Sequence, residues 1–292
     1  MKDLLLYLAL RGGVAFVGSL PKKAALWLGS AMGRIWHLFD RSRRDMATRN
    51  MRRVLGPDGD ATAASRAVME SYGRYLAEAL WARGHRVPDM LANTETDGLD
   101  MVIQAHNEGR GMIYALPHMG NWEAAAPVAV NLGIPVVAVA EDLDNQRITE
   151  WFTKLRAEFG IEIVLATGRV EVMRNLEKAI ANNKAVALLS DRDLKGRGVE
   201  VELFGEKTTL PAGPATLAVK TGAPLFPVAT YFEGDGHRVV VRPRLSIPPA
   251  ESRTEQVQLL TEELALELEK LILEAPQQWH MVQPFWSSDR EG

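Results

Sequence analysis

Residues 112–123 read Met-Ile-Tyr-Ala-Leu-Pro-His-Met-Gly-Asn-Trp-Glu. The apolar residues 112–116 predict a buried β-strand. Pro117 is expected to end it, because proline has no backbone N–H to donate to a sheet. Asn121 is a favourable N-cap residue, so a helix is expected to start there. The stretch therefore predicts a strand, a short polar turn and a helix.

Apolar runs alternate with helical patterns along the rest of the chain. The candidate strands are 112–116, 134–140, 161–165, 185–190, 199–204, 224–231 and 237–242. The candidate helices are 62–84, 121–132, 145–159, 170–182, 211–221 and 254–274. This alternation predicts an α/β fold with a mixed, mostly parallel sheet flanked by helices on both faces.

The turn after the first predicted strand carries two side chains suited to acid–base chemistry. Histidine is the usual general base near neutral pH, and a carboxylate that fixes its tautomer is the usual partner. On a continuous helix His118 and Glu123 would lie about 140° apart, whereas across a loop and a first helical turn they can converge. The alternative is a histidine that ends a strand and a glutamate that favours a helix N-terminus.

The string His-Met-Gly-Asn-Trp-Glu at 118–123 resembles the His-x4-Asp/Glu signature of membrane glycerolipid and lipid A acyltransferases. It is most similar to the form found in lipid A late acyltransferases and in actinobacterial phosphatidylinositol mannoside acyltransferases. The aromatic ending Pro-Gln-Gln-Trp-x5-Phe-Trp at 276–286 resembles the same family, although aromatics there also serve to fill the core. The resemblance implies a glycerol-phosphate acyltransferase-like fold, with His118 as general base and Glu123 as its partner.

Glu141 and Arg156 are candidate substrate-binding residues. Glu141 follows the strand 134–140, at the carboxyl end where open α/β sheets bind ligands; the alternative is a carboxylate at a helix N-terminus. Arg156 lies at the edge of the apolar stripe of the helix 145–159, so it either reaches solvent or points into a cleft. The family resemblance implies that an arginine near this position binds anionic substrate groups.

A polar loop, Asp191-Arg192-Asp193, follows the strand 185–190. It resembles the aspartate-rich third motif of the family, and the Phe-Gly pair at 204–205 resembles the strand after that motif. Lipid A enzymes are expected to have Asp-Gln in this loop, so the difference favours the phosphatidylinositol mannoside branch. Arg192 has the planar fork that binds a phosphate or carboxylate, or it forms a surface ion pair with a neighbouring aspartate.

These residues predict one acceptor cleft. Four residues are expected to line it: Arg156, Asp191, Arg192 and Glu200. Each side chain should lie within about 15 Å of His118, because a greater distance, far beyond one hydrogen-bonded shell, would contradict the grouping. The alternation of side chains along 199–204 leaves two orientations open for Glu200, toward the cleft or toward solvent.

The net charge of −3 conceals an asymmetry. Residues 1–56 carry +8 and two interrupted apolar segments, whereas the remainder carries −11. Neither segment provides the roughly 18 apolar residues of a spanning helix. We therefore predict an amphipathic, basic membrane-association segment at 1–56 and an acyltransferase domain at 57–292. The alternative is two helices that pack on the catalytic domain; nucleic acid is not expected as a partner.

The resemblance implies transfer of a fatty acyl group from acyl-CoA, or from acyl carrier protein, to a mannose hydroxyl of a phosphatidylinositol mannoside. It implies no metal and no cofactor, and a peripheral position at the cytoplasmic face of the plasma membrane. The chain has no cysteine, which excludes a thiolate nucleophile. Three alternatives remain: a lipid A-type lauroyl or myristoyl transferase that uses acyl carrier protein, a non-catalytic lipid-binding protein, and a hydrolase that activates water.

Overall fold

The computed structural model describes residues 2–193 and 196–289. Its α-helices are α1 (Lys2–Ser19), α2 (Lys22–Phe39), α3 (Arg41–Leu55), α4 (Ala61–Trp81), α5 (Val87–Ala92), α6 (Leu99–Asn107), α7 (Ala125–Asn131), α8 (Gln146–Ala157), α9 (Arg169–Ala181), α10 (Gly213–Thr221) and α11 (Arg253–Glu274). Its strands are β1 (Thr94–Asp97), β2 (Met112–Leu116), β3 (Val136–Ala140), β4 (Ile161–Leu165), β5 (Ala185–Leu189), β6 (Val199–Leu203), β7 (Glu206–Leu210), β8 (Leu225–Glu233) and β9 (Gly236–Val241). Short 3-10 helices are η1 (Gly84–Arg86), η2 (Trp122–Ala124), η3 (Pro276–Gln278) and η4 (Ser287–Asp289).

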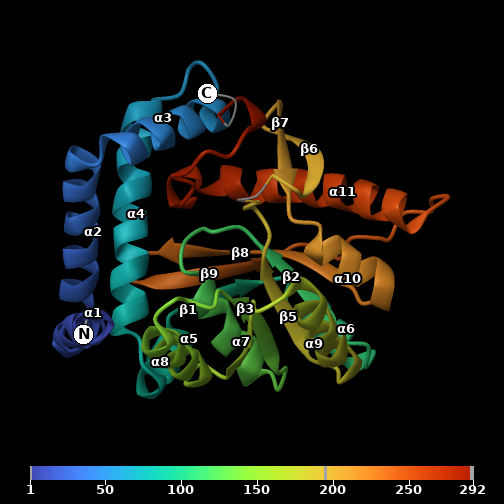
Figure 1. Ribbon diagram of the computed structural model, residues 1–292, viewed down its shortest axis with the longest axis horizontal. Helices are drawn as coiled ribbons and strands as arrows, with labels where there is room; N and C mark the ends of the chain where they lie inside the picture. The colour runs from blue at the N-terminus through green and yellow to red at the C-terminus, as the bar shows by residue number, and fades with distance from the viewer. Residues whose placement is uncertain (1, 194–195, 290–292) are drawn as a thin grey trace.

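The main sheet has seven strands in the order β1-β9-β8-β2-β5-β3-β4. All neighbours are parallel except β8 and β9, which are antiparallel. The strands β6 and β7 form a separate antiparallel hairpin. Figure 1 shows helices on both sides of the sheet, with α11 crossing one side and α5, α7 and α8 on the other. The predicted α/β fold with a mixed, mostly parallel sheet is confirmed.

Side chains of the central strand β2 alternate between two apolar cores. Ile113 and Ala115 belong to the core beneath α9, α10 and α11. Met112, Tyr114 and Leu116 belong to the core beneath α6, α7 and α8. Because successive side chains of a strand point to opposite faces, a strand in the middle of a two-faced sheet must be apolar throughout. All five residues of β2 are buried accordingly.

The helix α2 lies directly against α4, side by side in Figure 1. Glycines allow the close approach: a Cβ at Gly29 would lie 2.5 Å from the carbonyl oxygen of Gly73, and one at Gly33 would lie 2.1 Å from that of Met69. The helix α2, which belongs to the predicted segment 1–56, is therefore packed onto α4. The predicted ranges 1–56 and 57–292 also include residues 1, 194–195 and 290–292, which lie outside the described part.

The sequence patterns missed two strands, and they predicted a single helix where the structure has two. β1 reads Thr-Glu-Thr-Asp and is an exposed edge strand, so no apolar pattern marks it. β7 reads Glu-Lys-Thr-Thr-Leu and is similarly poor in apolar residues. The predicted helix 121–132 is divided into η2 and α7.

Candidate active site

His118 and Asp191 meet because two strands that are distant in sequence are neighbours in the sheet. The parallel strands β2 and β5 pair with Leu116 opposite Leu189. His118 and Asp191 each lie two residues beyond these positions, at the carboxyl ends of their strands. Their side chains are joined by a hydrogen bond of 2.5 Å between His118 Nδ1 and Asp191 Oδ1.

Asp191 is held by three hydrogen bonds and is 1% exposed. Besides the imidazole, its carboxylate accepts from the backbone N–H of His118 at 3.0 Å and from the indole N–H of Trp279 at 2.8 Å. Burial alone would raise the pKa of Asp191, but the charge and hydrogen bonds of His118, with a contribution from Arg192, lower it to about 2. The group is therefore an ionised acceptor at neutral pH.

An ionised acceptor fixes the tautomer of the neutral imidazole. Because Asp191 can only accept, the proton of neutral His118 sits on Nδ1, and Nε2 carries the free lone pair. The histidine side chain is 14% exposed and lines a cavity. The arrangement is that of a general base whose orientation is fixed by a carboxylate, with the basic nitrogen left for a substrate proton.

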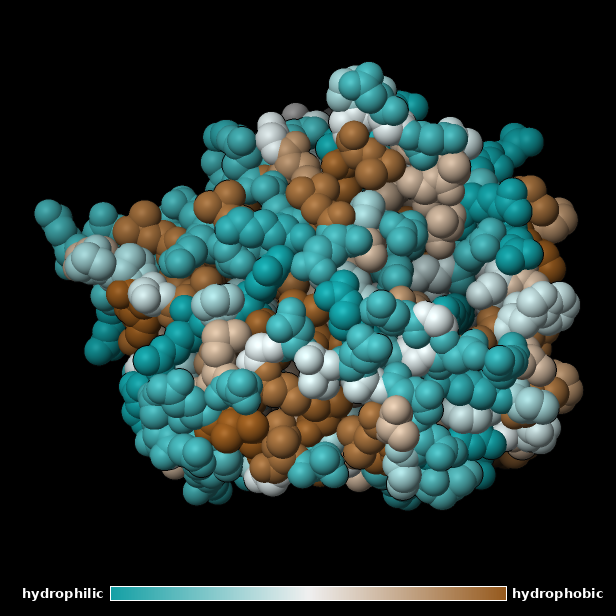
Figure 2. Space-filling model, turned by 180° about the vertical axis from the view of Figure 1, so that it is seen from behind, coloured by the Kyte–Doolittle hydropathy of each residue, from teal (hydrophilic) through white to brown (hydrophobic). Residues whose placement is uncertain are grey.

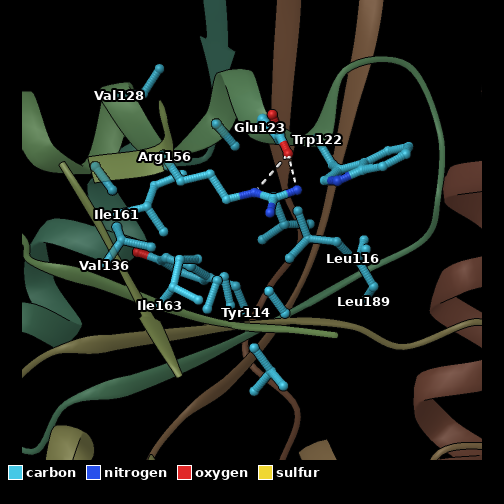
Figure 3. A pocket seen from close by; sticks show the side chains of 18 of the residues that line it. Tyr114, Leu116, Trp122, Glu123, Val128, Val136, Arg156, Ile161, Ile163 and Leu189 are labelled. Atoms are coloured by element: carbon cyan, nitrogen blue, oxygen red, sulfur yellow. Dashed lines mark hydrogen bonds and ion pairs between the residues drawn. The ribbon is translucent and has the colours of Figure 1, made fainter. Parts of the chain in front are cut away.

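The prediction that the Glu123 carboxylate contacts the imidazole of His118 is wrong. The Glu123 carboxylate instead accepts from Arg156 Nε at 3.0 Å and Nη2 at 2.8 Å, as the dashed lines in Figure 3 show. Burial by itself lowers the pKa of Arg156, but the charge and hydrogen bond of Glu123 outweigh it and leave the pKa raised. The Glu123 carboxylate is engaged in a half-buried ion pair, and the carboxylate that contacts the imidazole is that of Asp191.

The carboxy-terminal segment after α11 holds the histidine loop in place. The backbone N–H of His280 donates to the carbonyl of His118 at 2.7 Å, and that of Gly120 donates to the carbonyl of Gln278 at 3.0 Å. Trp279 is fully buried and reaches Asp191. The expectation that the terminal aromatics fill the core is confirmed, and Trp279 has in addition a polar contact that the sequence pattern did not reveal.

His118 lines an apolar cavity of about 420 Å³. The cavity lies between the sheet and helices α7 and α8, and Figure 3 shows Glu123, Arg156 and Trp122 on its wall. Most of the lining is aliphatic: Leu116, Val128, Leu132, Val136, Ala138, Ile161, Ile163, Ala187, Leu189, Val228, Val239 and Val241. Its size and lining are those of a site for an apolar ligand with one polar end.

The other predicted residues have different positions. Glu141 is exposed but lies on the cavity lining, and Arg156 also belongs to it. Arg192 donates from Nη2 to the carbonyl of His280 at 2.6 Å, so it lies on the far side of the histidine loop, next to Asp191. The prediction that Glu200 lines the cleft is wrong, because it lies on the solvent side of β6 and pairs with Lys207 at 2.9 Å.

Among the described residues, no group of three or more histidine, aspartate or glutamate side chains is placed to bind a metal ion. In the same part of the chain, no helix has the length and apolar character needed to cross a bilayer.

Comparison of the sequence with known proteins shows the family to which the chain belongs. A family model described as bacterial lipid A biosynthesis acyltransferase matches residues 4–288. The chain therefore belongs to this family and is an acyltransferase. The family predicted from the 118–123 string is confirmed.

Curated relatives narrow the comparison. The phosphatidylinositol mannoside acyltransferase of Mycolicibacterium smegmatis is 36% identical over 249 residues, which cover 82% of this chain and 79% of the relative. The protein of the same name from Mycobacterium tuberculosis is 37% identical over 246 residues, covering 82% and 76%. The crystal structure of the 1-acyl-sn-glycerophosphate acyltransferase PlsC from Thermotoga maritima aligns with 83% of this chain and 97% of its own, at 12% identity and a TM-score of 0.37. That last similarity is too weak to carry a conclusion.

Replacement of Glu123 by glutamine should impair catalysis more than it impairs binding of the acyl donor. The amide oxygen can still accept both hydrogen bonds from Arg156, but the change removes the charge that strengthens them, so the guanidinium is held less firmly and can shift along the cavity wall. A displacement of this kind should reduce kcat at least about tenfold. Steady-state kinetics with a thioester donor measures the effect. Glu162→Gln, which removes the exposed ion pair to Lys184, is the matched control and should have normal kinetics.

Proposed function

We propose that this acyltransferase moves a fatty acyl group from acyl-CoA to a hydroxyl of a glycolipid, the mannose of a phosphatidylinositol mannoside. The observation that carries the proposal is the His118–Asp191 pair, with His118 on the lining of the apolar cavity. The acceptor is supported by the names of the two mycobacterial relatives and their 36–37% identity. The Asp-Arg-Asp loop, in which Asp191 contacts His118, adds support because it differs from the sequence expected of lipid A enzymes.

In the proposed reaction, proton removal from the acceptor accompanies its attack on the thioester. Nε2 of His118 removes the proton of the acceptor hydroxyl while its oxygen attacks the thioester carbonyl carbon. Asp191 stabilises the imidazolium that forms. The C–O bond forms, the C–S bond breaks, and the thiolate leaves with the proton from the imidazolium. The products are the acylated glycolipid and free coenzyme A.

The apolar cavity is the proposed site for the acyl chain. Each methylene buried there contributes about 0.8 kcal/mol relative to water, so a long chain provides most of the binding energy. Arg156 and Glu123 lie on the cavity wall and are proposed to provide charges for the thioester end. An acyl donor bound in this way presents its carbonyl near His118.

Mass spectrometry of the products tests the proposal. Palmitoyl-CoA is incubated with the protein and a panel of acceptors: phosphatidylinositol mannosides, phosphatidylinositol and a lipid A precursor. We expect an acyl ester on the mannoside. A parallel reaction with palmitoyl-acyl carrier protein separates the two donors. Acylation of the lipid A precursor alone would overturn the acceptor, and thioester loss that does not depend on any acceptor would identify a hydrolase.

We also propose that α1 and α2 contact an anionic membrane. Exposed apolar side chains on these helices include Leu5 at 62%, Trp27 at 66% and Phe39 at 82%. Figure 2 shows apolar atoms along the edge of the molecule where these helices lie. The charge of +8 overstates the basic surface, because Arg53 is engaged in ion pairs with Glu206 and Asp289. Apolar burial is therefore expected to contribute beside the electrostatic attraction.

Binding to vesicles should require anionic lipid, weaken with salt and not vanish entirely. Because α2 packs on α4, substitutions of outward-facing residues are a cleaner test than deletion of residues 1–40. Trp27→Gln with Phe39→Gln should reduce vesicle binding and transfer to liposomal acceptor more than transfer to the same acceptor dispersed in detergent. Val170→Gln, at a 72% exposed position on α9, is the control. If the unmodified protein does not bind anionic vesicles at low salt, the membrane proposal fails, and α1 and α2 only pack against the rest of the protein.

A further inference from the structure

A second buried carboxylate lies outside the proposed reaction steps. Glu78 on α4 is 1% exposed, and its side chain lies between His237 on β9 and Asn121 in the histidine loop, which are 1% and 2% exposed. Burial of a carboxylate carries a large desolvation cost, which an apolar residue at the same position would avoid. The group therefore calls for an explanation in terms of what it contacts.

One oxygen of Glu78 accepts two hydrogen bonds. Its Oε2 accepts from Asn121 Nδ2 at 2.9 Å and is 2.8 Å from His237 Nε2. The other oxygen, Oε1, lies 3.6 Å from the ammonium of Lys22 on α2. Burial raises the pKa of Glu78, but the hydrogen bond and charge of His237, then Asn121 and Lys22, leave it lowered. The carboxylate is therefore ionised in its buried site.

The contact with Glu78 fixes which way the Asn121 amide faces. A carboxylate only accepts, so it selects the NH₂ end of the amide and turns the carbonyl oxygen the other way. That oxygen accepts from the backbone N–H of Glu123 at 3.2 Å and caps η2. Glu78 thus reaches the start of the short helix that carries Trp122 and Glu123.

The neighbouring residue of the loop, Gly120, packs closely against β8. Gly120 has φ of +53°, and a Cβ there would lie 2.0 Å from the carbonyl oxygen of Thr230 on β8. Trp122, two residues further on, packs edge-on against the His118 ring with centroids 5.2 Å apart. The loop from His118 to Glu123 is therefore held by β8 at Gly120 and by Glu78 at Asn121.

We propose that Glu78 is a positioning residue for acyl transfer: its carboxylate orients Asn121, and Asn121 holds η2 so that Trp122 and Glu123 keep their places beside His118. The inference rests on the proposed function. Lys22 supplies the opposite charge from α2, and His237 completes the hydrogen bonding of the carboxylate.

Four variants test this role: Glu78→Ala, Glu78→Gln, Asn121→Ala and, as a control, Asp289→Ala. Asp289 is a carboxylate with a side chain 2% exposed, and its partner Arg53 lies on α3. Its removal should lower the melting temperature and leave kcat unchanged. Glu78→Ala and Asn121→Ala should lower kcat about 10- to 100-fold, as misplacement of catalytic groups by about 1 Å does, with little change in KM for the acyl donor.

The conservative variant distinguishes positioning from general stability. Both hydrogen bonds end on the same oxygen of Glu78, so the amide oxygen of Glu78→Gln can accept both and should restore most of kcat. The double variant Glu78→Ala/Asn121→Ala should be no worse than either single change, because the two residues act in series. Additive losses, or normal kcat in Glu78→Ala, would overturn the inference. If Glu78→Ala does not fold, Asn121→Ala decides by the same criterion.

Hydrogen–deuterium exchange provides a readout that does not need turnover. Exchange at residues 118–124 should increase in Glu78→Ala and Asn121→Ala and stay unchanged in Asp289→Ala. Unchanged exchange in this segment would overturn the positioning role. If the unmodified protein shows no transfer at all, the proposed function fails, while the exchange experiment still tests the contact of Glu78 with the loop.

Discussion

Replacement of His118 by alanine is expected to reduce acyl transfer by about 10²–10⁴-fold or more and to leave the fold intact. The imidazole lines the apolar cavity, and an ionised carboxylate fixes its tautomer. Without it, the acceptor hydroxyl must lose its proton to water, which is a weak base.

Product formation with saturating acyl-CoA and glycolipid measures the loss. His85→Ala removes an exposed histidine and should retain full activity. Circular dichroism should show that His118→Ala is still folded, while its melting temperature should fall, because the buried carboxylate of Asp191 loses its imidazole partner. Turnover by His118→Ala within a few-fold of the unmodified protein would rule out the general-base role.

Replacement of Asp191 by asparagine should lower kcat about as strongly, by roughly 10²–10⁴-fold. Asparagine is nearly isosteric, so the cavity keeps its shape. Its amide, however, either presents an NH₂ group to Nδ1 or offers only a neutral acceptor. The first arrangement moves the proton of His118 to Nε2, where no base remains, and the second stabilises the imidazolium less.

The same change should alter the acid stability of the protein. The pKa of Asp191 is about 2 in the folded state, below the ordinary value of 3.8. A lowered carboxyl pKa contributes stability that is present above pH 3.8 and is lost as the pH falls toward 2. The difference corresponds to about 2 kcal/mol. Unfolding titrations at pH 6, 4 and 2 should show this loss in the unmodified protein and not in Asp191→Asn. Equal acid sensitivity of the two proteins would contradict the proposed environment of the carboxylate.

The sequence was sufficient to predict the strand, turn and helix around His118, because these depend on local patterns of apolar residues, proline and an N-cap. It was not sufficient to identify the partner of the imidazole. β2 and β5 are neighbours although β3 and β4 lie between them in the chain, and a strand order of this kind does not follow from local patterns. One signal was present: His118 and Asp191 both follow the end of a buried strand, so neighbouring strands would bring them together.

Two other differences between the predicted and the observed positions of residues also have structural causes. Glu123 pairs with Arg156 because α8 returns over the cavity, a tertiary contact that a spacing of five residues cannot reveal. Glu200 faces solvent because side chains alternate along β6: Val201 and Leu203 are buried, and Glu200 and Glu202 are turned outward. The exposed position of Glu200 was one of the two orientations that the pattern left open.

The central claim is that His118, oriented by Asp191, promotes transfer from a thioester to a glycolipid hydroxyl. A single-turnover experiment with isotopically labelled palmitoyl-CoA and a phosphatidylinositol mannoside tests it most directly, with the label followed in ester and free acid by mass spectrometry. The unmodified protein should place the label on the glycolipid, and His118→Ala and Asp191→Asn should leave it on coenzyme A. Two results would contradict the account: release of the label as free palmitate at a rate that does not depend on the acceptor, or normal formation of the labelled ester by the two variants.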